Sequence, residues 1–194
     1  MENKSYDISE IIDKRYSPVL FADRPIEKDI LDTLFEAARQ APSSYNDQPW
    51  AFLVGDKYSN KGTYDLIFDA LMTVNQKWAK FAPVLMVSLG EKISPTTGKE
   101  NRYVLHDVGL AMGTMLYQAS EMDIYIHQMG GFSHSKIRKN FNLPDKYEVG
   151  AAIALGYKSQ EKEKYPKELV EKEENNLKNR TRKEIRDFLF YEKF

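Results

Sequence analysis

The chain has 194 residues, no cysteine, and 28 basic against 29 acidic side chains, giving a net charge of -1. This length favours one domain with a core that is stable without covalent staples, and the missing cysteines exclude disulfides and thiolate chemistry. The balanced charge argues against a nucleic-acid partner. Without a secretory signal at the N-terminus, or an apolar run near the ~20 residues of a membrane span, we expect a cytoplasmic protein with no membrane partner.

Hydrophobic spacing in the first part of the chain predicts three helices and one strand. A capping box at Asp7 and Glu10 opens the first helix, and Pro42 and Pro83 close the second and third. Pro18 leaves residues 14–21 extended. The predicted helices are 7–13, 27–39 and 63–80, and the predicted strand is 51–54.

Two apolar runs in the second part, 84–89 and 149–156, are typical of buried central strands. Residues 102–122 predict the longest helix, in which Gly109, Ala111 and Gly113 allow close approach of another helix. Residues 124–128 read as extended, 129–132 as a turn and 135–140 as a short helix. Together these elements indicate one mixed α/β domain spanning residues 1–194, in which helix 102–122 is buried at a subunit contact.

The last part of the chain changes in composition. Residues 158–186 are dominated by charge, yet residues 188–191 are Phe-Leu-Phe-Tyr. Disordered tails are usually poor in aromatic residues. We therefore expect residues 158–194 to form an extended arm whose apolar end docks on a second subunit.

The polar stretch 41–50, APSSYNDQPW, has two interpretations. Pro, Ser, Asn and Asp form turns, so it could simply connect a helix to a strand. Such a turn between rigid elements can also present several hydrogen-bonding groups to a ligand. The local sequence leaves both open.

Phosphate-binding motifs rich in glycine are absent, so any phosphate must be held by arginines and hydroxyls. Arg15 and Ser17, beside Tyr16, form one candidate cluster. Arg180 and Arg182 form another, although they could belong to a solvated run of charge. The spacing of the three histidines matches no metal motif, and His106 is expected in the core. Without a conspicuous nucleophile or acid–base pair, the chain is typical of enzymes in which a cofactor carries the chemistry.

Several stretches, in order, resemble the FMN-dependent nitroreductase family, which also contains quinone and enone reductases. Residues 41–50 closely match its A-P-S-x-x-N-x-Q-P-W signature. The other matching stretches are Arg15-Tyr-Ser17 with Phe21, Asn75-Gln-Lys-Trp78 before Ala82-Pro83, His106-Asp-Val-Gly109, His127-Gln-Met-Gly-Gly-Phe132, residues 149–156, and Arg180-Thr-Arg182. Tyr16 and Val19 stand where the family usually has basic residues, and Gly130 where some members have an acidic one.

The resemblance implies an α+β fold, a three-layer α-β-α arrangement with a central, mainly antiparallel sheet. It also implies an intertwined homodimer that exchanges C-terminal arms and holds two FMN molecules at the interface. The implied activity is a ping-pong oxidoreductase that passes hydride from NADH or NADPH, through the flavin, to a nitro compound, quinone or activated alkene. The alternative is an FMN-binding protein of this fold without reductase turnover, resembling a flavin destructase or a regulatory module.

The resemblance also implies which residues meet the cofactor, while no protein side chain is assigned a catalytic role. The opening loop and the C-terminal basic pair would hold the phosphate and ribityl chain, the polar turn would reach the cofactor from the other subunit, and the glycine loop would face the flavin ring. The implied contacts are Arg15, Tyr16, Ser17, Pro42, Ser43, Ser44, Asn46, Asn75, Gln128, Met129, Gly130, Gly131, Arg180 and Arg182.

Overall fold

Four antiparallel strands form the centre of the molecule, in the order β1-β2-β4-β3. The computed structural model describes residues 7–192. The strands are β1 (Trp50–Asp56), β2 (Val84–Glu91), β3 (Ile124–Met129) and β4 (Tyr147–Tyr157). Each predicted strand is present and extends one or two residues further at one or both ends.

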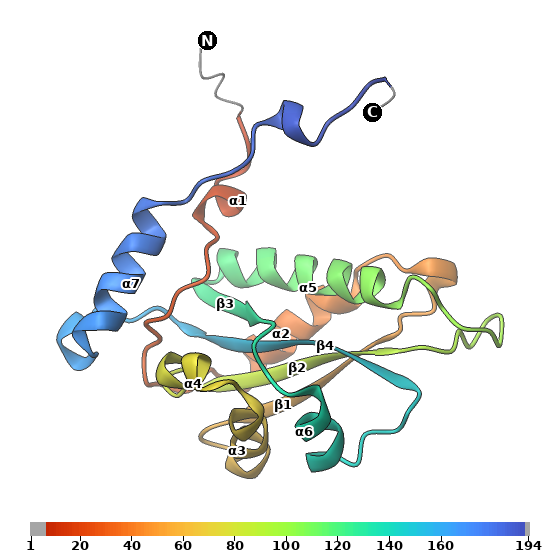
Figure 1. Cartoon of the computed structure of the whole chain (residues 1–194), viewed down its shortest axis with the longest axis horizontal. Coiled ribbons are helices and arrows are strands. Elements are labelled where there is room, and N and C mark those ends of the chain that lie inside the picture. Colours follow the sequence, from red (N-terminus) through yellow and green to blue (C-terminus); the bar gives the residue numbers. More distant parts are fainter. Residues whose placement is uncertain (1–6, 193–194) are drawn as a thin grey trace.

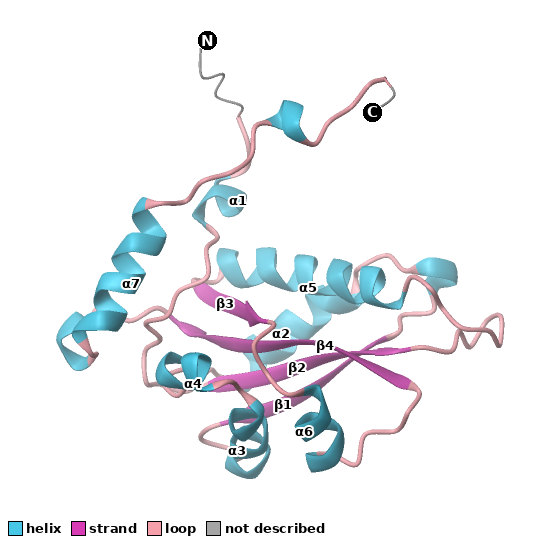
Figure 2. Cartoon of the chain, viewed as in Figure 1, coloured by secondary structure: helices cyan, strands magenta, loops and turns pink. Residues whose placement is uncertain are grey.

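Helices cover both faces of the sheet (Figures 1 and 2). Because side chains alternate along a strand, Val84 and Met86 of β2 face one layer, while Leu85 and Val87 face the other. One layer holds α2 (Lys28–Arg39) and α5 (Val104–Glu121), and the other holds α3 (Lys61–Ala70), α4 (Thr73–Ala79) and α6 (His134–Asn140). The predicted three-layer α-β-α fold with an antiparallel sheet is confirmed.

The described segments near the two termini run side by side as they leave the sheet (Figure 1). They include α1 (Glu10–Lys14) and α7 (Lys167–Lys178), with the single turns Lys162–Lys164 and Ile185–Asp187 flanking α7. Beyond α7, Phe188, Phe190 and Tyr191 are at least half exposed. The predicted charged arm is therefore present, but part of it is a helix rather than an extended segment.

Two helix predictions are wrong in detail. The first helix begins at Glu10 after Ser9, with no side-chain cap, so the capping box at Asp7 does not form. The predicted helix 63–80 is two helices, separated at Leu71 and Met72. The Met72 N–H donates to the carbonyl of Gly131 at 2.9 Å, so a tertiary hydrogen bond replaces the helical one.

Helix α5 is buried on one side only. Its inner face carries Ala111, Met112 and Met115, whereas Leu105 and Tyr117 are about half exposed. The expectation that His106 belongs to the core is wrong, because its side chain is 66% exposed on this outer face. Helix α5 therefore presents an exposed outer face, and α1 contacts it only near its C-terminal end, where Ser120 Oγ donates to the carbonyl of Ile11 in the described chain.

None of the helices that the structure describes is long and apolar enough to cross a membrane.

Candidate functional site

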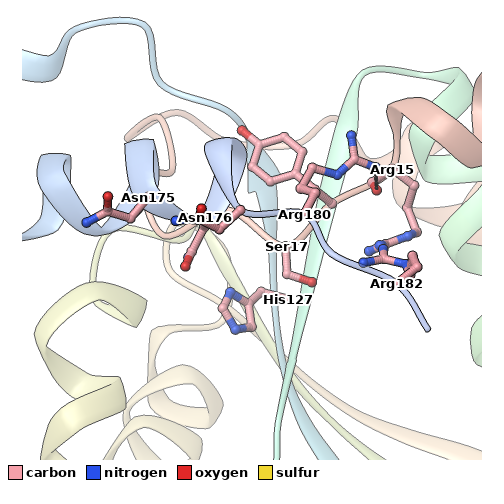
Figure 3. Close-up of a pocket in the computed structure, with 9 residues that line it drawn as sticks. Arg15, Ser17, His127, Asn175, Asn176, Arg180 and Arg182 are labelled. Carbon is pink, nitrogen blue, oxygen red and sulfur yellow. Dashed lines mark hydrogen bonds between the residues drawn. The ribbon is translucent and has the colours of Figure 1, made fainter. Parts of the chain in front are cut away.

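A pocket of about 450 Å³ lies where the two ends of the chain meet the tip of the sheet (Figure 3). The loop after α1, strand β3, helix α7 and the segment that follows α7 all contribute. The lining residues are Arg15, Tyr16, Ser17, His127, Asn175, Asn176, Asn179, Arg180 and Arg182. We call this pocket the anion pocket, because three arginines line it.

Three arginines converge on the anion pocket without a carboxylate to neutralise them. Arg180 Nη2 donates to the backbone carbonyls of Asp13 at 2.5 Å and Arg15 at 3.1 Å, and Arg182 Nη1 donates to the carbonyl of Thr181. Within residues 7–192 no acidic side chain forms a salt bridge with any of the three. Partial burial, followed by repulsion from Arg182 and Arg180, lowers the pKa of Arg15. A bound anion would relieve this repulsion and form charge-assisted hydrogen bonds.

Tyr16 lines the pocket wall, but its hydroxyl is engaged elsewhere. The side chain is buried, and the hydroxyl donates a 2.7 Å hydrogen bond to Oε1 of Glu173 in α7. Burial and then this hydrogen bond raise the pKa of Tyr16. The structure thus places Arg15 and Ser17 at the pocket with free polar groups, and Tyr16 between the pocket and α7.

His127 forms the floor of the pocket beside Ser17 (Figure 3). Its ring stacks on Trp78 with centroids 4.3 Å apart, and Nδ1 lies 2.8 Å from the carbonyl oxygen of Pro18. A carbonyl can only accept, so Nδ1 carries a proton and donates. Burial lowers the pKa of His127, which favours the neutral ring.

The predicted flavin-facing loop continues from β3 towards α4. Asn75 Nδ2 donates to the Gly131 carbonyl at 3.0 Å, so these two predicted residues are in contact. A Cβ at Gly131 would lie 2.7 Å from Asn75 Nδ2, which explains the glycine. Gln128 and Gly130 are exposed, whereas Met129 is 4% exposed and packs in the core below the loop.

The polar stretch 41–50 is a tightly held loop with a single 3-10 turn, Ser44–Asn46. Ser43 Oγ accepts the backbone N–H of Gln48 at 2.9 Å, and the Ser44 N–H donates to Asp107 Oδ2 at 3.1 Å. Tyr45, Asn46 and Gln48 all have positive φ angles, a costly conformation for residues other than glycine. Strained backbone of this kind clusters at ligand sites, so the stretch 41–50 stays a candidate binding loop.

One chain does not bring all the predicted site residues together. Asp107, which holds Ser44, lies in the first turn of α5, while Tyr117, ten residues later, borders a hollow with Arg15, Arg180 and Arg182. Ten helical residues span about 15 Å. The stretch with Pro42, Ser43, Ser44 and Asn46 therefore lies at one end of α5, and the anion pocket at the other.

Four residues lining the anion pocket were not predicted from the sequence as site residues: His127, Asn175, Asn176 and Asn179. The asparagines follow the i, i+1, i+4 pattern that places side chains on one side of a helix. The sequence contains this pattern, but the segment was expected to be extended, so the pattern did not indicate one face of a helix.

Comparison with known proteins agrees with the fold. Residues 12–66 and 55–157 match the nitroreductase family. A solved oxidoreductase containing FMN is 31% identical, with 99% of this chain and 95% of that chain covered and a TM-score of 0.87. A nitroreductase family protein from Clostridium difficile 630 is 25% identical, with 97% and 100% covered and a TM-score of 0.73.

A curated relative is more distant. The iodotyrosine deiodinase of Thermotoga neapolitana is 25% identical over 168 residues, which are 76% of this chain and 86% of the relative. The family match extends over well more than half of the chain, from α1 to the end of β4. The chain therefore belongs to the nitroreductase family.

Proposed function

We propose that this protein is an FMN-dependent oxidoreductase that takes electrons from NADH or NADPH and reduces an electron-poor acceptor. The acceptor would be a nitro compound, a quinone or an activated alkene. The observation that carries the proposal is the set of three arginines around a pocket of about 450 Å³, without a carboxylate partner in the described chain. Nitroreductase family membership and the FMN-containing structural relative support the choice of flavin.

The residues present fit FMN. Its phosphate would lie against Arg15, Arg180 and Arg182, with the Ser17 hydroxyl as a further donor. The amides of Asn175, Asn176 and Asn179 suit the ribityl hydroxyls, because an amide both donates and accepts. The backbone of Gly130 and Gly131, with Asn75 behind it, suits the polar edge of the ring. When bound, FMN supplies the redox chemistry, accepting hydride from the nicotinamide and delivering it to the acceptor.

A homodimer would complete this site. The loop with Ser43, Ser44 and Asn46 and the anion pocket lie at opposite ends of α5, so two copies packed antiparallel along α5 would bring one copy's loop to the other's pocket. The outer face of α5 supports this, since Leu105, Leu110 and Tyr117 are exposed there beside Gly109. The exposed Phe188 and Phe190 of the arm would be covered by the same partner.

In this proposal the chain's own residues bind, orient and exclude water. The arginines hold the anion, the 41–50 loop and the glycine loop enclose the ring, and the stacked Trp78 and His127 form an apolar floor. No side chain is needed as a nucleophile, in keeping with a chain that has no cysteine. Solvent can supply the proton that the reduced acceptor needs.

The test begins with the purified protein. It should be yellow, or become so on adding FMN, and an excess of NADH or NADPH without oxygen should bleach it. A panel of nitroarenes, quinones, enones and, prompted by the deiodinase relative, halogenated phenols would then be added to the reduced protein. A protein that cannot be loaded with FMN contradicts the proposal. Loading without turnover by any donor and acceptor would favour the non-reductase alternative.

A further inference from the structure

Glu173 is a buried carboxylate on a helix whose other charged residues are exposed. It is 1% exposed, and with Leu169 one turn earlier it forms the part of α7 that is buried. Oε1 accepts from the Tyr16 hydroxyl and Oε2 from the Val19 N–H, both at 2.7 Å. A carboxylate is costly to bury unless its oxygens are hydrogen-bonded, and here one short loop supplies a donor for each oxygen.

This pair of hydrogen bonds joins the two segments that line the anion pocket. The loop between Tyr16 and Val19 follows Arg15 and contains Ser17. Two of the pocket asparagines lie on α7 and the third is its C-cap, two to six residues after Glu173. Arg180 adds a second link, through its bond to the Arg15 carbonyl. The spacing between Arg15 and the arginines beyond α7 is therefore set by how α7 sits on this loop.

We propose that Glu173 is a positioning residue that fixes the Arg15–Ser17 loop against α7, so that the anion pocket has the dimensions of a phosphate monoester. The inference rests on the proposed function, because the phosphate is that of FMN. A leucine at this position would avoid the cost of burying a charge, but it would leave the Tyr16 hydroxyl and the Val19 N–H without an acceptor. The carboxylate also fixes the position of the loop, because its two oxygens can accept both hydrogen bonds only when the loop lies in one place.

The direction in which Glu173→Gln changes phosphate binding distinguishes an electrostatic role of Glu173 from a positioning role. Burial is the main cause of the lowered pKa of His127 in the pocket floor. The negative charge of Glu173 acts to raise that pKa, which means that this charge acts on the pocket. If charge alone mattered, Glu173→Gln would remove a repulsion and strengthen phosphate binding. If Glu173 positions the loop, the same substitution weakens phosphate binding.

The experiment compares FMN with riboflavin, which has the same ring and ribityl chain but no phosphate. Dissociation constants for both are measured by fluorescence titration for the wild-type protein, Glu173→Gln, Tyr16→Phe and the double variant. Tyr16→Phe keeps the ring, which packs edge-on against Tyr125 at 5.3 Å, and leaves the carboxylate charge unchanged. Glu171→Gln is the matched control, because Glu171 is exposed on the same helix and, among residues 7–192, its ion pair is with Lys167.

Each single variant should raise the FMN dissociation constant about tenfold, as expected for the loss of a charged hydrogen bond. Riboflavin affinity should stay within about twofold, as should both affinities of Glu171→Gln. The double variant should be no weaker than the weaker single variant, because both changes break the same link.

Two results would overturn the inference. One is that Glu173→Gln binds FMN as tightly as the wild type or more tightly, and the other is an equal loss of FMN and riboflavin. If Glu173→Gln does not fold, as judged by its thermal transition, Tyr16→Phe decides by the same criteria. A wild-type protein that binds riboflavin as tightly as FMN is a separate failure, because it removes the phosphate role and with it the proposed function.

Discussion

The Ser44 N–H donates a 3.1 Å hydrogen bond to Oδ2 of Asp107, whose side chain is 3% exposed in the first turn of α5. This contact ties the strained loop 41–50 to the helix on which the proposed dimer would be built. Asp107→Ala would leave the Ser44 N–H without its partner. We expect a loss of about 1–3 kcal/mol in the free energy of unfolding, measured in urea.

The control for this prediction is Asp65→Ala. Asp65 pairs with Lys61 on the exposed side of α3, and such pairs contribute less than about 1 kcal/mol. Asp107→Ala should also weaken FMN binding if the loop forms a wall of the site. Equal stability of the two variants would contradict the structural role given to Asp107.

The sheet and its layers could be predicted from the sequence because burial dictates local pattern. Strand β2 is covered on both faces and is a nearly unbroken apolar run, interrupted by Ser88, and the central part of β4 has the same character. The break between α3 and α4 could not be predicted from the local sequence pattern, because neither Leu71 nor Met72 is a helix breaker. The helix ends there because Leu71 pairs with Phe132, 61 positions further along the chain.

Helix α7 was missed for a related reason. Its buried positions are Leu169 and Glu173, so the residue that completes the inward-facing stripe is charged. Hydrophobic periodicity cannot identify a helix whose key contact is a carboxylate. Of the four unpredicted pocket residues, Asn175 and Asn176 lie on α7 and Asn179 is its C-cap. The fourth, His127, lies on a predicted strand, but its stacking on Trp78 was not predicted.

The stacked pair of His127 and Trp78 predicts a dependence of stability on pH. Burial lowers the pKa of His127 in the folded protein below the value of about 6.5 in the unfolded chain. The unfolded chain therefore takes up the proton more readily. The resulting contribution to stability is complete above that pH and is lost progressively as the pH falls below it.

This dependence can be measured with His127→Gln, whose amide can still donate to the Pro18 carbonyl. Unfolding free energies would be measured at pH 7.5 and at pH 5.5, about one unit on either side of the usual pKa of histidine. The decrease from pH 7.5 to pH 5.5 should be larger for the wild type than for the variant. Other groups titrate in both proteins and cancel in the difference. Parallel pH profiles would show that protonation of His127 is not coupled to folding.

The arginines of the anion pocket predict the cost of losing phosphate contacts. Arg15→Ala should weaken FMN binding by about 1.5–3 kcal/mol, roughly ten- to a hundredfold. Arg15→Lys should recover only part of this, because an ammonium lacks the planar fork that grips two phosphate oxygens. Arg39→Ala is the control, since Arg39 pairs with Glu36 on α2 and is not among the pocket residues. Unchanged FMN affinity in Arg15→Ala would remove Arg15 from the phosphate site.

The outer face of α5 provides the sharpest test of the proposed homodimer. Nothing lies within 4 Å of the position that a Cβ would take on Gly109, so a side chain there has no clash inside one chain. In a helix-to-helix contact between two copies, however, glycine is what allows close approach. Gly109→Arg should therefore fold normally and sediment as a monomer at micromolar concentration, whereas the wild type should sediment as a dimer.

Gly62→Arg is the matched control for Gly109→Arg. Gly62 also lies in a helix, α3, and its Cβ position is equally open, so the same charge and bulk are added to a surface outside the proposed contact. This control should remain a dimer. Because the loop with Ser44 and the anion pocket lie at opposite ends of α5, separating the copies should also weaken FMN binding. A Gly109→Arg protein that binds FMN normally as a monomer would mean that one chain forms the site alone, and the assignment of Ser43, Ser44 and Asn46 to the site would have to be abandoned.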